Sequence, residues 1–221
     1  MSVILIGKNS NLYKNYKDSF NSFVDIAISA SDLESYSFNE NDSLIILSYG
    51  KSKKSIDLLA YNLSSLNVKF FLLISTCTTV VLEKTKCYAY PAIKQYQERL
   101  FVQKLKNVSI LSVGTIVDEK ADKEHQGTCI TKATVFFKIC EDIIRSTQSK
   151  KYLVEYEFSK FSNESSVEYK IFRAYKSLIT LLPLPCLLRP LDILLKYFGC
   201  KWYGYGVLTT ILLEKKHGYR V

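Results

Sequence analysis

The sequence predicts an α/β fold in which a parallel sheet is covered by helices on both faces. Short apolar runs alternate with segments of helical spacing along the first 117 residues. The first run, Val3–Ile6, stops at Gly7 and is followed by a helical segment, which is how such sheets begin. The runs are mostly apolar, as is typical of parallel strands that are buried on both faces.

The predicted elements of this region alternate in the manner of βαβ units. Strands are expected at Val3–Ile6, Phe23–Ile28, Leu44–Leu47, Val68–Ile74 and Val108–Val113. Helices are expected over residues 11–23, 51–66 and 91–106, with a short helix or loop over residues 29–38. Ligands of such sheets bind outside the carboxyl ends of the strands. The candidate segments are therefore the five strand ends: Gly7, Ser29 to Ser31, Ser48 to Gly50, Ser75 to Thr79, and Gly114 with Thr115.

Beyond Val117 the pattern changes. Residues 118–128 are polar and predict a surface loop, whereas residues 131–147 predict an amphipathic helix. The remaining expected elements are an edge strand over 151–158, helices over 166–182 and 190–198, and a last apolar run over 206–213. Because no linker or repeat interrupts the chain, we expect a core over residues 1–117 and a C-terminal lobe over 118–221 that packs on it and binds substrate.

The composition argues against several classes of protein. The net charge of +9 suits an anionic ligand or a negatively charged surface, but most of it is explained by solvated lysines. Lysines and aromatic residues do not cluster in a nucleic-acid-binding module, so no nucleic-acid partner is expected. The six cysteines lack metal-ligand spacing, so no metal site is expected. They are expected to be free or buried thiols of a protein in the reducing cytoplasm.

No membrane-spanning segment or signal peptide is expected either. The N-terminal apolar run has only four residues, and prolines and charges interrupt the longer run Leu178–Leu195. The segment 181–195 could rest on a membrane surface, although a helix of the substrate lobe is the favoured interpretation.

A Tyr and a Lys four residues apart suggest proton-transfer chemistry. On a helix they share one face, so the ammonium can lower the pKa of the phenol and make it a usable acid or base. The spacing occurs at Tyr13/Lys17, Tyr49/Lys53, Tyr90/Lys94, Tyr156/Lys160 and Tyr197/Lys201. Only Tyr90 and Lys94 closely follow an apolar strand with a Ser/Thr cluster at its end. We expect this pair to be functional, the alternative being a packed tyrosine and a solvated lysine.

Several segments in a fixed order carry a family resemblance. They are VILIGKNSNL at 3–12, DSLIILSY at 42–49, STCTTVV at 75–81, YPAIKQYQE at 90–98 and ILSVGTIV at 110–117. Together they resemble the extended short-chain dehydrogenase/reductase family, the NAD-dependent epimerase/dehydratase group that acts on nucleotide sugars. The resemblance implies a Rossmann-like doubly wound sheet.

The resemblance also implies the residues of a site. The catalytic set would be Tyr90, Lys94, Thr76, Cys77 and Thr78. The residues that bind NADP or NAD would be Gly7, Asn9, Ser10, Asn11, Leu12, Leu47, Ser48, Tyr49, Lys94, Val113 and Gly114. The implied reaction is reduction or epimerisation of a nucleotide-linked sugar in bacterial surface polysaccharide biosynthesis, with 4-keto sugar reduction preferred. An inactive member that binds a nucleotide or a partner protein is the alternative, and the family further suggests a homodimer.

The sequence departs from the family pattern at three places. Ser10 and Tyr13 stand where the family has its second and third glycines, so Ser10 would bind phosphate or cap the helix, and Tyr13 would point away or hold the helix off the sheet. Cys77 aligns with the catalytic hydroxyl, for which Thr76 or Thr78 could substitute. Ser29 and Ser31 follow the second strand where an acidic residue would bind a ribose hydroxyl, which slightly favours NADP.

Overall fold

The structure, a computed structural model, describes residues 2–48, 50–81, 88–118, 126–146, 152–181, 188–197 and 204–218. It forms two compact units. The first contains Met1–Ser75, Ile93–Ser112 and Thr134–Val154, and the second contains Thr76–Ala92, Val113–Ala133 and Glu155–Val221. The chain therefore passes between the units several times. The division into a core over residues 1–117 and a substrate-binding lobe over 118–221 stays a prediction.

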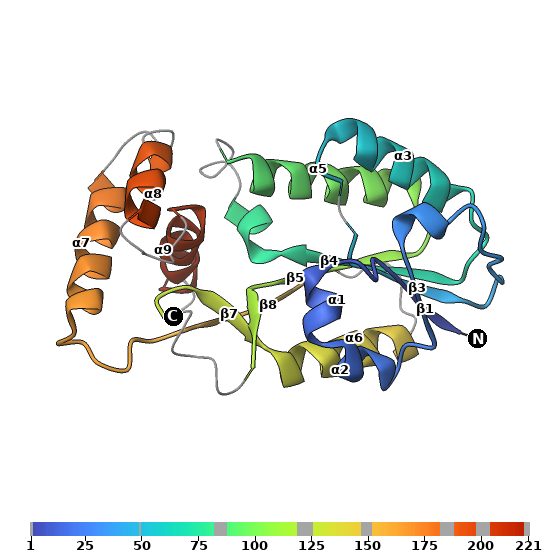
Figure 1. Cartoon of the computed structure of the whole chain (residues 1–221), viewed down its shortest axis with the longest axis horizontal. Helices are drawn as coiled ribbons and strands as arrows, with labels where there is room; N and C mark the ends of the chain where they lie inside the picture. The colour runs from blue at the N-terminus through green and yellow to red at the C-terminus, as the bar shows by residue number, and fades with distance from the viewer. Residues whose placement is uncertain are drawn as a thin grey trace. The chain divides into compact units, whose positions relative to one another are not determined.

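A six-stranded sheet with the order β2-β1-β3-β4-β5-β8 forms the centre of the first unit (Figure 1). Its strands are β1 Val3–Ile6, β2 Ile26–Ile28, β3 Ser43–Ile46, β4 Phe70–Thr76, β5 Val108–Val113 and β8 Tyr152–Glu155. The pairs β1/β2, β1/β3 and β3/β4 are parallel. Because β2 and β3 lie on opposite sides of β1, the strand order reverses there. The predicted Rossmann-like α/β fold is confirmed.

Helices cover both faces of this sheet, as predicted. On one face lie α3 Lys53–Ser64 and α5 Ala89–Lys104, and on the other lie α1 Asn11–Asn15, α2 Lys17–Asn21 and α6 Ala133–Ser146 (Figure 1). Alternate strand residues such as Ile4, Leu44 and Phe71 pack with Ile56 and Phe101 on the α3 and α5 side. A short 3-10 turn, η1 Ala30–Asp32, follows β2.

The helix predicted over residues 11–23 is broken, which is a correction. Tyr16, with φ −125° and ψ 32°, ends α1 and precedes α2. Tyr13 is buried, its ring centroid lies 5.7 Å from that of Phe20, and its hydroxyl donates to Asn21 Oδ1 at 3.3 Å. Phe20 in turn makes an edge contact with Phe137 at 4.9 Å. The bulky residue at the third glycine position thus joins an aromatic cluster.

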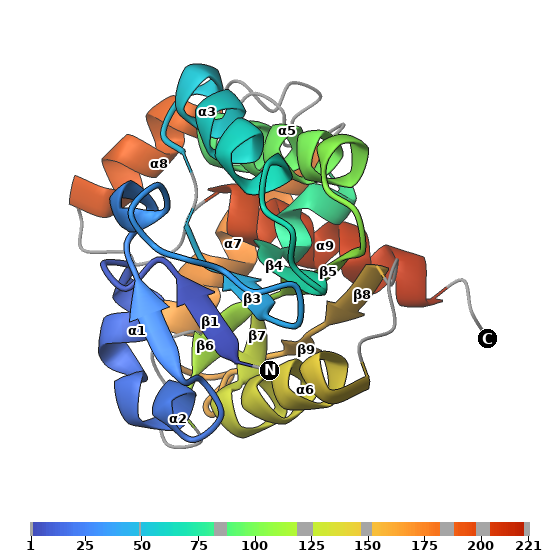
Figure 2. The same ribbon diagram turned by 90° about the vertical axis from the view of Figure 1, so that its right-hand side faces the viewer.

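The second unit contains a small sheet that the sequence did not predict (Figure 2). It consists of β6 Thr115–Val117, β7 Cys129–Lys132 and β9 Glu157–Phe158. β6 and β7 are parallel, and β7 and β9 are antiparallel. The single edge strand expected over 151–158 is therefore wrong, because β8 and β9 belong to different sheets. With only four residues, Cys129–Lys132, β7 gave no clear period in the sequence.

Helices form the rest of the second unit. They are the 3-10 helix η2 Cys77–Val81 and the helices α7 Val167–Leu181, α8 Leu188–Tyr197 and α9 Gly204–Gly218. Both α7 and α8 pack on α9, and Phe172, Tyr175 and Ile179 of α7 are buried with Val207 and Ile211 of α9. In the described part of the chain, every helix is too short or too polar to cross a membrane.

Candidate functional site

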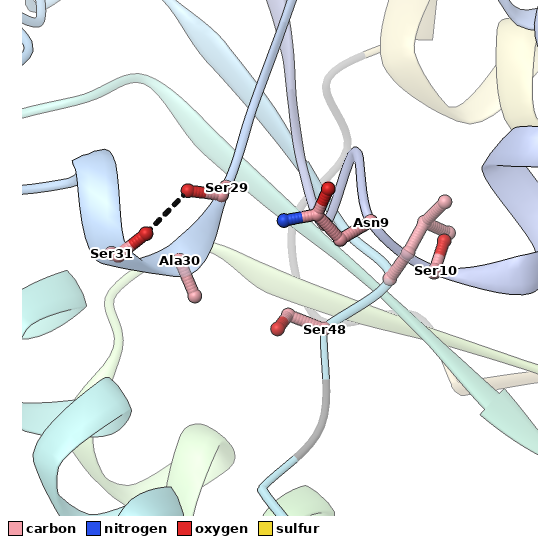
Figure 3. Close-up of a pocket in the computed structure, with 8 residues that line it drawn as sticks. Asn9, Ser10, Ser29, Ala30, Ser31 and Ser48 are labelled. Carbon is pink, nitrogen blue, oxygen red and sulfur yellow. Dashed lines mark hydrogen bonds between the residues drawn. The ribbon is translucent and has the colours of Figure 1, made fainter.

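A cavity of about 360 Å³ lies at the carboxyl ends of β1, β2 and β3 in the first unit. It is lined by Gly7, Asn9, Ser10, Ser29, Ala30, Ser31, Leu47 and Ser48 (Figure 3). The strand order reverses at β1, so the cavity occupies the point where ligands of doubly wound sheets bind. Its volume is within the range of small-molecule sites.

Gly7 makes this arrangement of strand ends possible. Its φ is +120°, and a Cβ atom there would lie 2.9 Å from Ser48 N and 3.2 Å from Leu47 Cβ. Gly7 N donates to Ile28 O at 2.9 Å, and Ser48 N donates to Ile6 O at 3.2 Å. The three strand ends are therefore tied together by backbone hydrogen bonds around a residue that cannot carry a side chain. The missing side chain lets the end of β3 approach the Gly7 backbone closely, and Gly7 itself lines the cavity.

The cavity walls carry small polar groups. The Asn9 amide and the Ser48 hydroxyl point toward the space between them and the segment Ser29 to Ser31 (Figure 3). On that opposite wall, Ser29 Oγ and Ser31 Oγ share a hydrogen bond of 2.6 Å. These hydroxyl and amide groups can hydrogen-bond the ribose or phosphate oxygens of a nucleotide.

The Ser10 side chain caps the helix that follows it. Its Oγ accepts a hydrogen bond from Tyr13 N at 3.1 Å and so forms the N-cap of α1. Of the two roles that the sequence left open, helix capping is the one seen. Asn11 and Leu12 follow in the first turn of α1, and neither lines the cavity.

An ion pair fixes the turn after β2. Lys8 Nζ lies 3.0 Å from Asp32 Oδ2, which also accepts from Ser29 N at 3.3 Å. The hydrogen bond from Lys8 is the main reason that the pKa of Asp32 falls to about 2, with the Ser29 bonds adding to it. The Asp32 carboxylate is thus ionised and paired with the Lys8 ammonium beside the cavity wall.

A second polar cluster lies in the first unit where α5 meets the ends of β3 and β4. The buried side chains of Lys94, Gln97 and Glu98 share one face of α5. Ser75 Oγ, at the end of β4, donates to the Glu98 carboxylate. Gln97 Nε2 donates to Ser48 O at 2.9 Å, and this bond connects the cluster to the cavity. Gln97 Oε1 is buried and has no hydrogen-bond partner among the described residues.

Burial changes the acidity of Lys94. The pKa of its ammonium falls to about 8, mainly because burial penalises the charged form, while the Glu98 carboxylate opposes the fall. Near neutral pH the group is still mostly protonated. It therefore places a poorly solvated positive charge on this face of α5, where a neighbouring phenol or ribose would be strongly affected.

The predicted catalytic residues divide between the units. Lys94 belongs to the first, whereas Tyr90, Thr76, Cys77 and Thr78 belong to the second. Tyr90 is half-buried and lies four residues before Lys94 on the same helix, α5, so helical geometry gives the two residues a common face.

The threonine hydroxyl groups at the end of β4 and just after it form local hydrogen bonds with Thr76. Thr78 Oγ1 donates to Thr76 Oγ1 at 3.2 Å, and Thr79 Oγ1 donates to Thr76 O at 2.8 Å. The Cys77 thiol is buried with Cys129 and Leu213. A hydrogen bond with Cys129, together with burial, raises the pKa of Cys77 well above its usual value. Cys77 therefore stays protonated within a small apolar cluster.

The last predicted cofactor residues lie at the end of β5. Val113 is buried, and Gly114 lies against β7, since a Cβ atom there would be 2.7 Å from Cys129 O. Gly114 N donates to Thr131 Oγ1 at 2.9 Å. Packing within the second unit therefore explains why a glycine stands at this position. Tyr49 lies outside the described residues.

Some site residues were not assigned from the sequence. Ser29, Ala30 and Ser31 line the cavity, and the only sequence signal was their place after an apolar strand. Gln97 and Glu98 are two further site residues that were not assigned. Their spacing of three and four residues from Lys94 on a helix was the signal that could have identified them. Within the described part of the chain, no group of three or more His, Cys, Asp or Glu side chains could hold a metal ion.

No family model matches the sequence, and no curated protein sequence matches it significantly. Solved structures do resemble it. A short-chain dehydrogenase/reductase from Veillonella parvula in complex with NADP is 12% identical, with a TM-score of 0.54 over 73% of this chain and 99% of that one. The dTDP-4-dehydrorhamnose reductase from Bacillus anthracis in complex with NADP is 14% identical, with a TM-score of 0.53 over 79% and 82%.

A further structural neighbour is a capsular polysaccharide assembling protein from Staphylococcus aureus. It is 13% identical to this chain, with a TM-score of 0.52 over 80% of this chain and 58% of that one. At these identities the likeness concerns the fold. The chain thus has a Rossmann-like fold, and this fold is shared with short-chain dehydrogenases/reductases.

Proposed function

We propose that the chain is an NADP- or NAD-dependent reductase or epimerase that acts on a nucleotide-linked sugar. The observation that carries this proposal is the cavity at the switch point of the sheet, built around Gly7 and lined by small polar side chains. Reduction of a 4-keto sugar for a bacterial surface polysaccharide is the preferred reaction. It is supported by the fold shared with a dTDP-4-dehydrorhamnose reductase and a capsular polysaccharide assembling protein.

The residues around the cavity fit a dinucleotide. Gly7 lines the cavity and would face the pyrophosphate, while its Cβ position is filled by Ser48 and Leu47 at the end of the neighbouring strand. Asn9 and Ser48 would bond the phosphate and ribose oxygens. Lys8 pairs with the ionised Asp32 carboxylate near Ser29 and Ser31, and it would favour NADP by exchanging this partner for an adenosine 2′-phosphate. The neighbours from V. parvula and B. anthracis were both crystallised with NADP.

The catalytic step needs a proton donor and an oriented carbonyl. Bound NADPH would supply the hydride that reduces the keto carbon. Tyr90 would donate its phenolic proton to the carbonyl oxygen as that carbon becomes an alcohol carbon. The buried ammonium of Lys94 would lower the pKa of Tyr90 and bond the cofactor ribose. The Thr76 and Thr78 hydroxyls would orient the carbonyl, because the Cys77 thiol is buried among apolar groups and is a poor donor.

Binding without catalysis is the second candidate function. It is favoured by the first helix of the fold, because α1 has only five residues and the Ser10 hydroxyl already caps it. A cofactor would therefore gain little from the dipole of this helix. Cys77, which is buried and stands where the family has a catalytic hydroxyl, also favours a role without catalysis. Such a protein would bind a nucleotide or a partner enzyme.

Cofactor binding tests the two functions first. The protein is titrated with NADPH and NADH, and binding is followed by nucleotide fluorescence and calorimetry. We expect saturable binding, tighter for NADPH than for NADH. Absence of binding for both nucleotides at millimolar concentration would remove the reductase proposal and leave a non-catalytic role.

Turnover is then measured with 4-keto nucleotide sugars. Tyr90→Phe should lower kcat by about 100-fold or more, the usual contribution of a positioned general acid. Tyr197→Phe is the matched control, since Tyr197 belongs to another Tyr-x-x-x-Lys pair and is 86% exposed. Equal rates for wild type and Tyr90→Phe would exclude Tyr90 from the mechanism.

A further inference from the structure

Helix α7 has two separate apolar faces. Phe172, Tyr175 and Ile179 form the face that is buried in the second unit. The other face consists of side chains that recur every three or four residues and are all exposed: Val167, Ile171, Ala174, Leu178 and Leu181. We call these five residues the α7 stripe. It runs the full length of the helix.

The α7 stripe is more than scattered surface hydrophobicity. Val167 is 72% exposed and Leu181 is 81% exposed. Helix α8, which also packs on α9, exposes Ile193, Leu194 and Tyr197 as well. Single exposed apolar residues are normal, but a continuous run of them marks an interaction surface.

Positive charge is concentrated in the same part of the chain. The segment Val167–Val221 holds nine basic and three acidic residues, a net charge of +6 out of the chain's +9. On α7 itself, Lys170 and Arg173 are exposed, and neither forms an ion pair within the part of the chain that the structure describes. Lys176, in contrast, pairs with Glu214 at 2.7 Å.

We propose that the α7 stripe and the exposed side of α8 dock on an anionic lipid bilayer. An amphipathic helix with apolar side chains on one face and lysine or arginine beside them lies in the membrane interface, and its basic residues attract anionic headgroups. A second copy of the chain is a poorer occupant, because a symmetric contact would bring two strongly positive surfaces together. The proposal does not depend on catalysis.

Vesicle co-sedimentation of the full chain tests the proposal. One set of vesicles contains phosphatidylcholine alone, and the other contains phosphatidylcholine with phosphatidylglycerol. We expect binding only to the second set, weakened by high salt. Ile171→Glu combined with Leu178→Glu should reduce binding at least tenfold. Lys170→Gln combined with Arg173→Gln should reduce it roughly 30-fold, at about 1 kcal/mol for each basic residue.

A matched control introduces the same charges on another surface. Leu58 and Val102, in the first unit, are 60% and 58% exposed, so Leu58→Glu combined with Val102→Glu should bind vesicles like wild type. Circular dichroism checks that every variant is folded. Equal binding to both vesicle types, no binding to either, or unchanged binding of the stripe variant would overturn the proposal. So would self-association that the stripe variant abolishes without any change in vesicle binding.

Discussion

The strands β1 and β5 both end at a glycine, and the two glycines have different surroundings. Gly7, after β1, has a φ of +120° and lines an open cavity. Gly114, after β5, lies against the backbone of β7, with Cys129 O and Ile130 C both 2.7 Å from its Cβ position. Both glycines let the backbone of another strand end approach closely, and Gly7 also lines a cavity. A strand followed by glycine therefore indicates close approach without saying what approaches.

The side chains near the two strand ends differ in the same way. In the first unit, Asn9 and Ser48 point into the cavity, and buried Lys94 and Glu98 lie on α5. In the second unit, the Gly114 amide is satisfied by Thr131, whose hydroxyl donates to Glu155 O at 2.7 Å. Asn9 and Ser48 thus face the cavity, whereas the polar groups around Gly114 serve the fold.

The largest effect is expected at the closed strand end. Gly114→Val would force its side chain against the backbone of β7, which cannot move aside as a flexible side chain could. We expect a loss of about 4 kcal/mol in the free energy of unfolding, above the usual range for overpacking. Urea denaturation measures it. Gly206→Ala is the control, because nothing lies within 4 Å of that position and alanine favours a helix by up to about 1 kcal/mol. Equal stability of Gly114→Val and wild type would contradict the packing role.

The next effect concerns Lys94 and pH. The pKa of Lys94 is about 8 in the folded protein against 10.5 for a solvated lysine, so the unfolded chain holds this proton over a pH range in which the folded protein releases it. The contribution of Lys94 to the free energy of unfolding therefore rises between pH 8 and 10.5. Below pH 8 the cost of burying its charged form is fully present. Lys94→Met should lack this rise, which amounts to about 3 kcal/mol.

The measurement for Lys94 is the difference in unfolding free energy between wild type and variant from pH 7 to above pH 10. A constant offset, such as the loss of the ammonium near Glu98, does not alter the slope of this difference. Lys54→Met, at an exposed position on α3, should give a flat difference. A flat difference for Lys94→Met as well would mean that Lys94 is solvated.

Much of the first sheet could be predicted from the sequence. The strands Val3–Ile6 and Val108–Val113 have the predicted bounds, because mostly apolar runs ending at glycine give a strong signal. The second sheet could not be predicted, since β6, β7 and β9 have only three, four and two residues. Their pairing depends on contacts distant in sequence. The break at Tyr16 is accompanied by tertiary packing that the local sequence does not reveal, namely of Tyr16 and Phe20 on Phe137.

The candidate site was predictable to a similar degree. Gly7, Asn9, Ser10, Leu47 and Ser48 line one cavity, as expected for strand ends at one edge of a sheet. Their individual tasks could not be derived, because the Ser10 hydroxyl suits a phosphate and a helix cap equally well in the sequence. The catalytic roles of Tyr90, Lys94 and Thr78 stay predictions.

A smaller effect is expected at the open strand end. Gly7→Ala would place a side chain at φ +120° and 2.9 Å from Ser48 N. We expect a loss of about 2 kcal/mol in stability, the usual cost of one strained backbone position. NADPH affinity should fall as well, because the methyl group would displace Leu47 and Ser48, which line the cavity. Calorimetry on the folded variant separates the two effects, and unchanged affinity would show that the ligand does not depend on this wall of the cavity.

The smallest effect, at Ser10, shows whether its hydroxyl serves the helix or the ligand. Ser10→Ala removes the cap on Tyr13 N and should cost about 1 kcal/mol of stability. NADPH affinity should change by less than about threefold, since the hydroxyl is already used. Ser10→Asp keeps a capping oxygen and should retain stability, while its negative charge should weaken NADPH binding if phosphate lies nearby. A tenfold loss of affinity in Ser10→Ala with stability unchanged would reverse the assignment, making Ser10 a ligand contact and leaving α1 without need of its cap.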